Sequence, residues 1–181
     1  MAKQYPVITE KLASFITDQK IFFVATAAQK GSVNVSPKGM DSLRILNDKR
    51  VVWLNVTGSG NETSAHVQQV NRMTLMFCSF TGEPMILRLY GKTKEIAPAD
   101  NDWSELYSLF DPLPGCRQIF DLDIDLVQTS CGMAVPFFDY VEERMQLNNW
   151  AEKKGNEGIR QYWQEKNQVS IDGYQTNIMK K

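Results

Sequence analysis

Residues 57–64 combine glycine, hydroxyl and amide side chains at a spacing that suits anion binding. Gly58 and Gly60 let the backbone approach a ligand closely, and a helix is expected to start just after them. The first N–H groups of a helix have no partners within it and carry partial positive charge, which favours a phosphate. An ordinary helix N-cap at Asn61 or Thr63 explains the same residues without a ligand. The segment is not a nucleotide-binding P-loop, because no Gly-Lys-Ser/Thr sequence closes it.

Ser36 and Lys38 form a second candidate site at the end of an expected strand. The lysine can neutralise one phosphate charge, and the hydroxyl beside it can donate a hydrogen bond. A lysine that is simply exposed to solvent in a turn is the alternative. Taken alone, this segment therefore does not distinguish a ligand contact from a surface turn.

Two further polar residues, Arg88 and His66, lie in apolar surroundings. Arg88 interrupts an apolar strand, and alternation places it on the face shared by Ile86 and Tyr90. If it is buried there it requires an acidic or anionic partner, either an internal carboxylate or a ligand. His66 is the one histidine of the sequence and fits a packed or capping role in the helix that follows residue 61.

The cysteine pattern argues against disulfides and against a metal centre. Cys78, Cys116 and Cys131 are odd in number and have no C-x-x-C spacing. A zinc site with several His and Cys ligands is not expected from them, whereas small buried thiols in a reducing compartment are. We therefore predict no metal site, and the pattern assigns no catalytic residue.

The composition is that of an ordinary globular protein without excess charge. The chain has 181 residues, a mass of 20.7 kDa, 20 basic and 21 acidic residues, and a pI of about 5.9. This balance predicts binding neither to nucleic acid nor to an anionic membrane, and no apolar run approaches the ~20 residues of a membrane span. The N-terminus lacks the apolar core of a signal peptide. We therefore expect a single cytoplasmic domain over residues 1–181.

Most expected elements are strands joined by short turns. Apolar residues at helical spacing predict helices over residues 9–16, 63–70, 101–110 and 142–167. Alternating or continuous apolar runs predict strands over residues 21–26, 33–36, 43–46, 51–56, 73–80, 85–96 and 122–127. Because hairpin connections favour antiparallel pairing, the fold class is mainly β, a barrel or open antiparallel sheet with attached helices.

The order of these segments resembles one known family. The matching stretches are residues 33–39, 51–55, 58–66, 72–78, 86–91 and 130–136. Together they are similar to the pyridoxamine 5′-phosphate oxidase-like, FMN-binding split-barrel family. The resemblance covers residues 8–140 as the flavin-binding core and leaves residues 141–181 as a polar helical C-terminal extension.

This resemblance implies a six-stranded antiparallel split β-barrel that forms a homodimer, with FMN in clefts at the subunit interface. In the family, basic or hydroxyl groups from the second strand and from the helix after the fourth strand hold the cofactor phosphate, and these positions correspond to Ser36, Lys38, Thr63 and Ser64. The strand segment Trp53-Leu54-Asn55 would line the ring and ribityl chain. Carried over to this sequence, the implied FMN-binding residues are Asn34, Ser36, Lys38, Trp53, Leu54, Asn55, Asn61, Glu62, Thr63, Ser64 and Arg88.

Two departures from authentic pyridoxamine phosphate oxidases concern the substrate. Those enzymes carry an Arg-Lys pair where this chain has Thr63 and Ser64, and their Arg- and Trp-bearing C-terminal segment is not found in residues 142–181. We therefore expect a flavin-dependent oxidoreductase that acts on an unidentified small molecule. A non-catalytic flavin- or haem-binding storage or sensor protein is the alternative, and a deazaflavin in place of FMN also fits the sequence.

Overall fold

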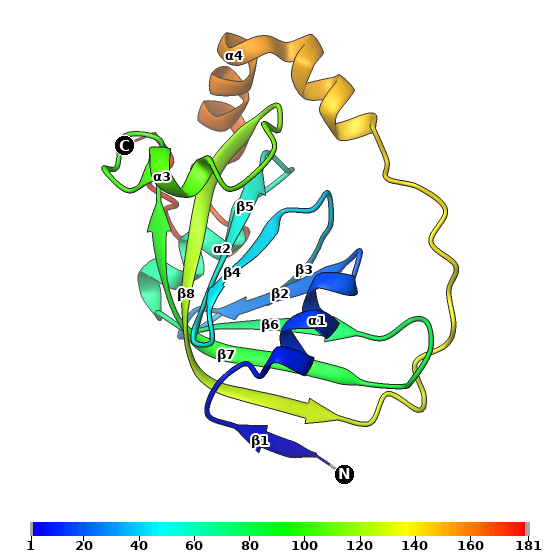
Figure 1. The fold of residues 1–181 in the computed structure, drawn as a ribbon. Coiled ribbons are helices and arrows are strands. Elements are labelled where there is room, and N and C mark those ends of the chain that lie inside the picture. The colour runs from blue at the N-terminus through cyan, green and yellow to red at the C-terminus, as the bar shows by residue number, and fades with distance from the viewer. Residues whose placement is uncertain (1, 180–181) are drawn as a thin grey trace.

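The computed structural model describes residues 2–179, and its main feature is one antiparallel sheet that partly closes on itself (Figure 1). The strand order is β3-β2-β6-β7-β8-β5-β4, and β1 pairs separately with β8. The strands are β1 (Lys3–Tyr5), β2 (Phe22–Ala27), β3 (Val33–Lys38), β4 (Leu43–Asn47), β5 (Arg50–Val56), β6 (Met73–Cys78), β7 (Ile86–Ile96) and β8 (Cys116–Ser130). The helices are α1 (Glu10–Asp18), α2 (Glu62–Gln69), α3 (Trp103–Tyr107) and α4 (Gln146–Lys166).

The two longest strands, β7 and β8, join the two halves of this split barrel. β7 pairs with β6 along one edge and with β8 along the other, and β8 continues into pairing with β5. The β7–β8 register shifts between Tyr90 and Gly91. A Cβ atom on Gly91 would lie 1.9 Å from the Asp123 carbonyl oxygen, so only glycine allows the strands to approach this closely where they bend.

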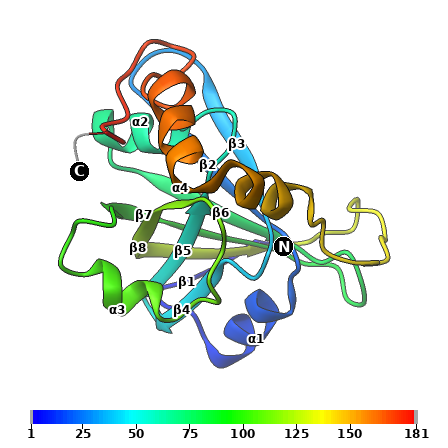
Figure 2. The ribbon, with the colours of Figure 1, turned by 90° about the horizontal axis from the view of Figure 1, so that it is seen from above.

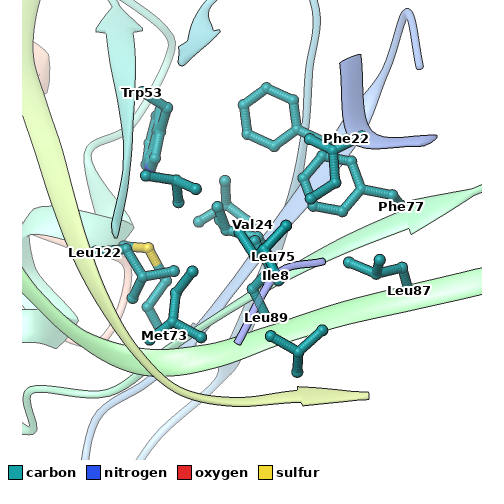
Figure 3. Close-up of a cluster of buried hydrophobic side chains, with 14 of the residues drawn as sticks. Ile8, Phe22, Val24, Trp53, Met73, Leu75, Phe77, Leu87, Leu89 and Leu122 are labelled. Atoms are coloured by element: carbon teal, nitrogen blue, oxygen red, sulfur yellow. The ribbon is translucent and has the colours of Figure 1, made fainter. Parts of the chain in front are cut away.

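The main hydrophobic core fills the interior of the barrel (Figure 3). α1 covers one end of it with Leu12 and Ile16, and the Thr9 hydroxyl caps this helix by accepting from the Leu12 N–H. Trp53 is fully buried in this core and stacks on Phe120 with ring centroids 4.7 Å apart. Burying an aromatic side chain of this size stabilises a fold by roughly 1.5–3 kcal/mol, so Trp53 is part of the scaffold.

A second, smaller core lies under α3. Alternate residues of β5 serve the two cores: Val51 and Trp53 belong to the barrel interior, whereas Val52 and Leu54 pack with Leu106 of α3. β5 is therefore buried on both faces, and its C-terminal end is held rigidly where the candidate site begins.

The fold is the antiparallel split barrel that the sequence predicts, but the sheet has eight strands instead of the six expected. The N-terminus, for which no element is expected, forms β1, and Lys3 pairs with Thr129. This is possible because the β5–β8 pairing ends at Asp123 and leaves the last part of β8 with an open edge. β3 also continues past its expected end through Pro37, which an edge strand tolerates because a missing N–H there faces solvent.

The C-terminal extension is only partly helical. α4 occupies most of the expected range but is broken at Gly155, whose φ of 64° is left-handed. Residues 131–145 and 167–179 on either side have no helix. Figure 2 shows α4 on the same side of the barrel as α2 and β3, opposite α1. Within residues 2–179, no helix is long and apolar enough to cross a membrane.

Candidate functional site

A cleft of about 620 Å³ opens between β3 and the end of β5. The turn after β3, the loop of residues 57–61 and the start of α2 form its other walls. Leu147 of α4 and Ile171 of the C-terminal segment also line it. Its volume is in the range of pockets that hold small-molecule ligands and cofactors.

Most of the residues predicted to bind FMN line this cleft. They are Asn34, Ser36, Lys38, Leu54, Asn55, Asn61, Glu62 and Thr63. On β3 the alternation of a strand explains the arrangement, because Val33 and Val35 are 70% and 59% exposed on the opposite face. The sequence therefore predicted a set of residues that the fold brings together, and their contact with FMN stays a prediction.

Trp53 and Ser64, two of the predicted contact residues, do not line the cleft. Trp53 points into the barrel core, and the Lys38 Nζ lies 5.4 Å from the centroid of its ring. Ser64 is fully buried on the far side of α2, where its hydroxyl is hydrogen-bonded to the Glu95 carboxylate and to the Thr176 carbonyl oxygen. Both residues therefore support the walls of the cleft from behind.

Arg88, the third such residue, lies outside the cleft on β7. Two strands, β2 and β6, separate β7 from β3 in the sheet. The Arg88 guanidinium Nη1 donates a hydrogen bond to the Ser130 hydroxyl at 3.2 Å. The strand order thus explains why this arginine does not reach the other predicted residues.

Lys38 and Arg117 place two cationic side chains in the lining of the cleft. Arg117, near the start of β8, is 4% exposed and was not predicted from the sequence. Burial, and then the positive charge of Arg117, lower the pKa of Lys38 to about 8. Burial also lowers the pKa of Arg117 to about 10, although the Glu95 carboxylate opposes this shift. An anion bound beside these two cations would stabilise both charged forms.

Buried polar atoms without partners lie in the same lining. Among residues 2–179, neither Nδ2 nor Oδ1 of Asn61 has a hydrogen-bond partner, and neither does Nε of Arg117. Asn61 is 2% exposed and occupies the N-cap position of α2 without making the side-chain cap bond. Leaving such a group unsatisfied costs about 1–3 kcal/mol, so a polar ligand or an ordered water that reaches these atoms would stabilise the protein. Guanidinium, ammonium and amide groups at a helix start together fit a phosphate.

Asn34 connects the hydroxyl groups of the cleft into one network. Its Nδ2 donates to the hydroxyl oxygens of Thr63 and Thr26, both at 3.3 Å, and its Oδ1 accepts from the Ser36 hydroxyl at 2.9 Å. Because Thr63 accepts this bond, its own O–H remains available to donate to a ligand. The His66 Nδ1 lies 3.2 Å from the Thr26 hydroxyl, so the histidine anchors the network from behind.

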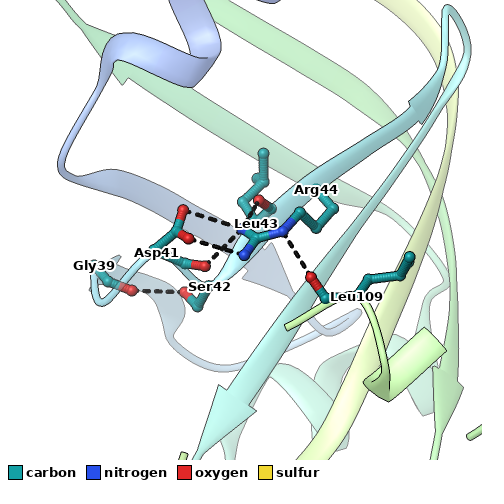
Figure 4. Close-up of polar contacts among 6 residues, drawn as sticks. All are labelled: Gly39, Asp41, Ser42, Leu43, Arg44 and Leu109. Carbon is teal, nitrogen blue, oxygen red and sulfur yellow. Dashed lines mark hydrogen bonds and ion pairs between the residues drawn. The ribbon is translucent and has the colours of Figure 1, made fainter. Parts of the chain in front are cut away.

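Polar contacts hold the turn that follows β3 (Figure 4), and two residues of this turn have a strained backbone. Met40 and Asp41 have φ values of 61° and 49°, which non-glycine residues rarely adopt. The Arg44 guanidinium is paired with the Asp41 carboxylate at 2.8 Å, and the Ser42 hydroxyl donates to the Gly39 carbonyl oxygen at 2.7 Å. These bonds hold the turn in this conformation and fix the direction in which the chain leaves β3.

Comparison with known proteins agrees with this fold. The family model described as pyridoxamine 5′-phosphate oxidase matches residues 8–131. The pyridoxamine 5′-phosphate oxidase family protein ustO of Aspergillus flavus is 33% identical over 187 aligned positions, which cover 93% of this chain and 75% of that protein.

Two solved structures share the fold at low sequence identity. HupZ of Group A Streptococcus has a TM-score of 0.52 and 16% identity, covering 66% of this chain and 91% of that one. The haem storage protein HutZ of Vibrio cholerae has a TM-score of 0.50 and 13% identity, and the match covers 70% of this chain and 97% of HutZ. At these identities the two structures are evidence of the fold alone. The match to the family model and the relationship to ustO go further, and they show that this chain belongs to the pyridoxamine 5′-phosphate oxidase family.

Proposed function

We propose that this chain is a cytoplasmic, FMN-dependent oxidoreductase that holds the FMN phosphate near Lys38, Arg117 and the start of α2. The observation that carries the proposal is the set of two desolvated cations and two residues with unpartnered buried polar atoms in one cleft. A phosphate dianion would satisfy both the charges and the unpartnered donors. Membership of the family supports a flavin as the ligand.

The residues of the cleft divide the binding task between charge, hydrogen bonding and apolar contact. Lys38 and Arg117 would supply charge to the phosphate, and the Thr63 hydroxyl would donate to it. Leu54 and Leu113 in the lining offer apolar surface to a flat ring. Bound FMN would supply the hydride or electron transfer, whereas the protein binds the cofactor, orients it and keeps water away.

Haem binding is less well supported at this site. The fold is shared with a haem storage protein, but a shared fold does not carry the ligand with it. His66 is 1% exposed, contacts Thr26 and is not among the residues that line the cleft. A haem in this cleft would therefore need an iron ligand other than histidine.

An absorption spectrum of the purified protein, followed by titration with FMN and riboflavin, tests the proposal. Lys38→Ala is expected to lower the affinity for FMN by about tenfold to a hundredfold, because a charge-assisted contact contributes ~1.5–3 kcal/mol. The affinity for riboflavin should change little, since riboflavin has no phosphate. Thr63→Ala should act in the same direction but less, and Lys11→Ala, exposed on α1, is the control. A Soret band in place of a flavin spectrum, or equal losses for FMN and riboflavin, would contradict the phosphate site.

Turnover is tested separately from binding. A reduced nicotinamide is expected to bleach the bound flavin, and an added electron acceptor should restore its colour. A protein that holds FMN but is neither reduced nor reoxidised under these conditions would favour the storage or sensor alternative.

We also propose that the protein is a homodimer with the cleft at the subunit interface. Val33 and Val35 are exposed on the edge strand β3 beside the cleft, and in residues 131–145 Phe137 and Val141 are 79% and 86% exposed. A subunit interface would bury these exposed apolar side chains and remove them from water. Light scattering should give twice the single-chain mass of 20.7 kDa, and Val35→Lys should shift the particle towards that single-chain mass. A wild-type particle of single-chain mass with flavin bound would contradict the dimer.

A further inference from the structure

Asn167, directly after α4, is the central residue of a buried contact between the C-terminal segment and the cleft. Its side chain is fully buried. Nδ2 donates to the carbonyl oxygens of Gly58 at 3.1 Å and Ser59 at 3.4 Å, and Oδ1 accepts from the Arg117 Nη1 at 2.7 Å. One amide side chain thus joins the glycine loop of the cleft to its most buried cation.

Arg117 completes this arrangement from β8. Its Nη2 donates to the Gly60 carbonyl oxygen at 2.9 Å, so Arg117 and Asn167 hold the two glycines of the loop and also each other. The Nε of Arg117 is left without a partner among the residues that the structure describes. Because Asn167 is neutral, it fixes the guanidinium without cancelling its charge.

A second layer of hydrogen bonds ties residues 167–179 to the elements around the cleft. The Ile171 N–H donates to the Glu62 carboxylate at the start of α2. The Asp172 carboxylate accepts from the Ser32 N–H at 2.7 Å, in the turn between β2 and β3. The C-terminal segment therefore spans from the start of α2 to the β2–β3 turn.

We propose that Asn167 is a positioning residue of the anion site, which holds Arg117 so that its charge acts on a phosphate, and that phosphate binding in turn orders residues 167–179. This inference rests on the proposed function, since it presumes that the cleft binds the FMN phosphate. The coupling runs both ways, because a segment that raises the affinity for a ligand is stabilised by that ligand to the same extent. Asn167 is not expected to touch the flavin ring.

Asn167→Asp is the sharpest test because the two side chains have the same shape. The aspartate can still accept from Arg117, but it neutralises the guanidinium charge and loses the donor to Gly58. We expect FMN affinity to fall by about tenfold or more, as for the loss of one charge-assisted contact, while riboflavin affinity changes less than about twofold. Asn156→Asp, which makes the same change at an exposed position of α4, should affect neither ligand.

Hydrogen exchange of the wild-type protein provides a second, independent measurement. FMN is expected to slow exchange of the backbone amides in residues 167–179 more than riboflavin does, since only FMN carries the phosphate. This measurement tests the coupling between the phosphate and residues 167–179 even if Asn167→Asp does not fold.

The outcomes separate this inference from the proposed function. If wild-type protein binds FMN no more tightly than riboflavin, the phosphate site itself is wrong. If Asn167→Asp prefers FMN over riboflavin as strongly as the wild type does, Asn167 does not position Arg117. The same conclusion follows if the variant loses affinity for FMN and riboflavin equally. Exchange of residues 167–179 that responds equally to both flavins would overturn the coupling.

Discussion

Raising the pH is expected to weaken FMN binding through the titration of Lys38. In the ligand-free protein the pKa of Lys38 is about 8 instead of 10.5, because burial and the charge of Arg117 disfavour the ammonium. A phosphate beside the ammonium favours the charged form and raises this pKa again. If the ordinary value is fully restored, FMN affinity should begin to fall near pH 8 and be weaker by on the order of 30-fold at about pH 9.5.

Flavin fluorescence titrations between pH 7 and 9.5 measure this effect. Riboflavin has the same ring without the phosphate, so the ratio of the two dissociation constants isolates the contribution of the phosphate. Lys38→Arg keeps its charge throughout the range and should give a ratio that changes much less with pH. A ratio independent of pH in the wild type, or an equally steep fall in Lys38→Arg, would refute this account of the site.

Three further predictions concern the stability of the ligand-free protein in urea. The pKa of Lys38 is lower in the folded than in the unfolded protein, so its charge destabilises the fold below about pH 8, and the free energy of unfolding rises from there to about pH 10.5. Lys38→Met should therefore raise the free energy of unfolding at pH 7 by ~1–3 kcal/mol, and a decrease would contradict this. Thr26→Val removes the hydroxyl beside His66 and should cost ~1–3 kcal/mol, against less than about 0.5 kcal/mol for Thr17→Val on the exposed face of α1. Gly91→Ala should lower stability by more than about 4 kcal/mol, since its Cβ would collide with β8, and a folded variant of near wild-type stability would show that the strands can separate there.

The sequence predicted those parts of the cleft that depend on a local pattern. Alternation along β3 places Asn34, Ser36 and Lys38 on one face, and a glycine-rich loop before a helix start places Thr63 nearby. Strand period and helix-start chemistry are visible in a single sequence, so these residues could be found without a structure. The hairpins that build the barrel were predictable for the same reason.

Residues whose role depends on distant contacts could not be found in this way. Arg117 lies 50 positions before Asn167 and 57 after Gly60, and a single basic residue at the start of a strand gives no sign of such partners. Trp53 shows the same limit, because a large aromatic residue on β5 fits either the wall of a flavin site or the core. Only its stack on Phe120, contributed by another strand, decides between these positions.

The contacts that close the proposed phosphate site also bear on the order in which the chain folds. Ser32 and Asp172 are 140 positions apart, and Gly58 and Asn167 are 109 apart, whereas the β2–β3 and β6–β7 hairpins join neighbours. Contacts of long sequence separation form more slowly than local ones, because a long loop must close first. We therefore expect the barrel to assemble before residues 167–179 dock on it. A ligand that binds only the form with residues 167–179 docked shifts the docking equilibrium towards that form by mass action. The concentration of flavin during folding would therefore set the fraction of the protein in which this segment is docked.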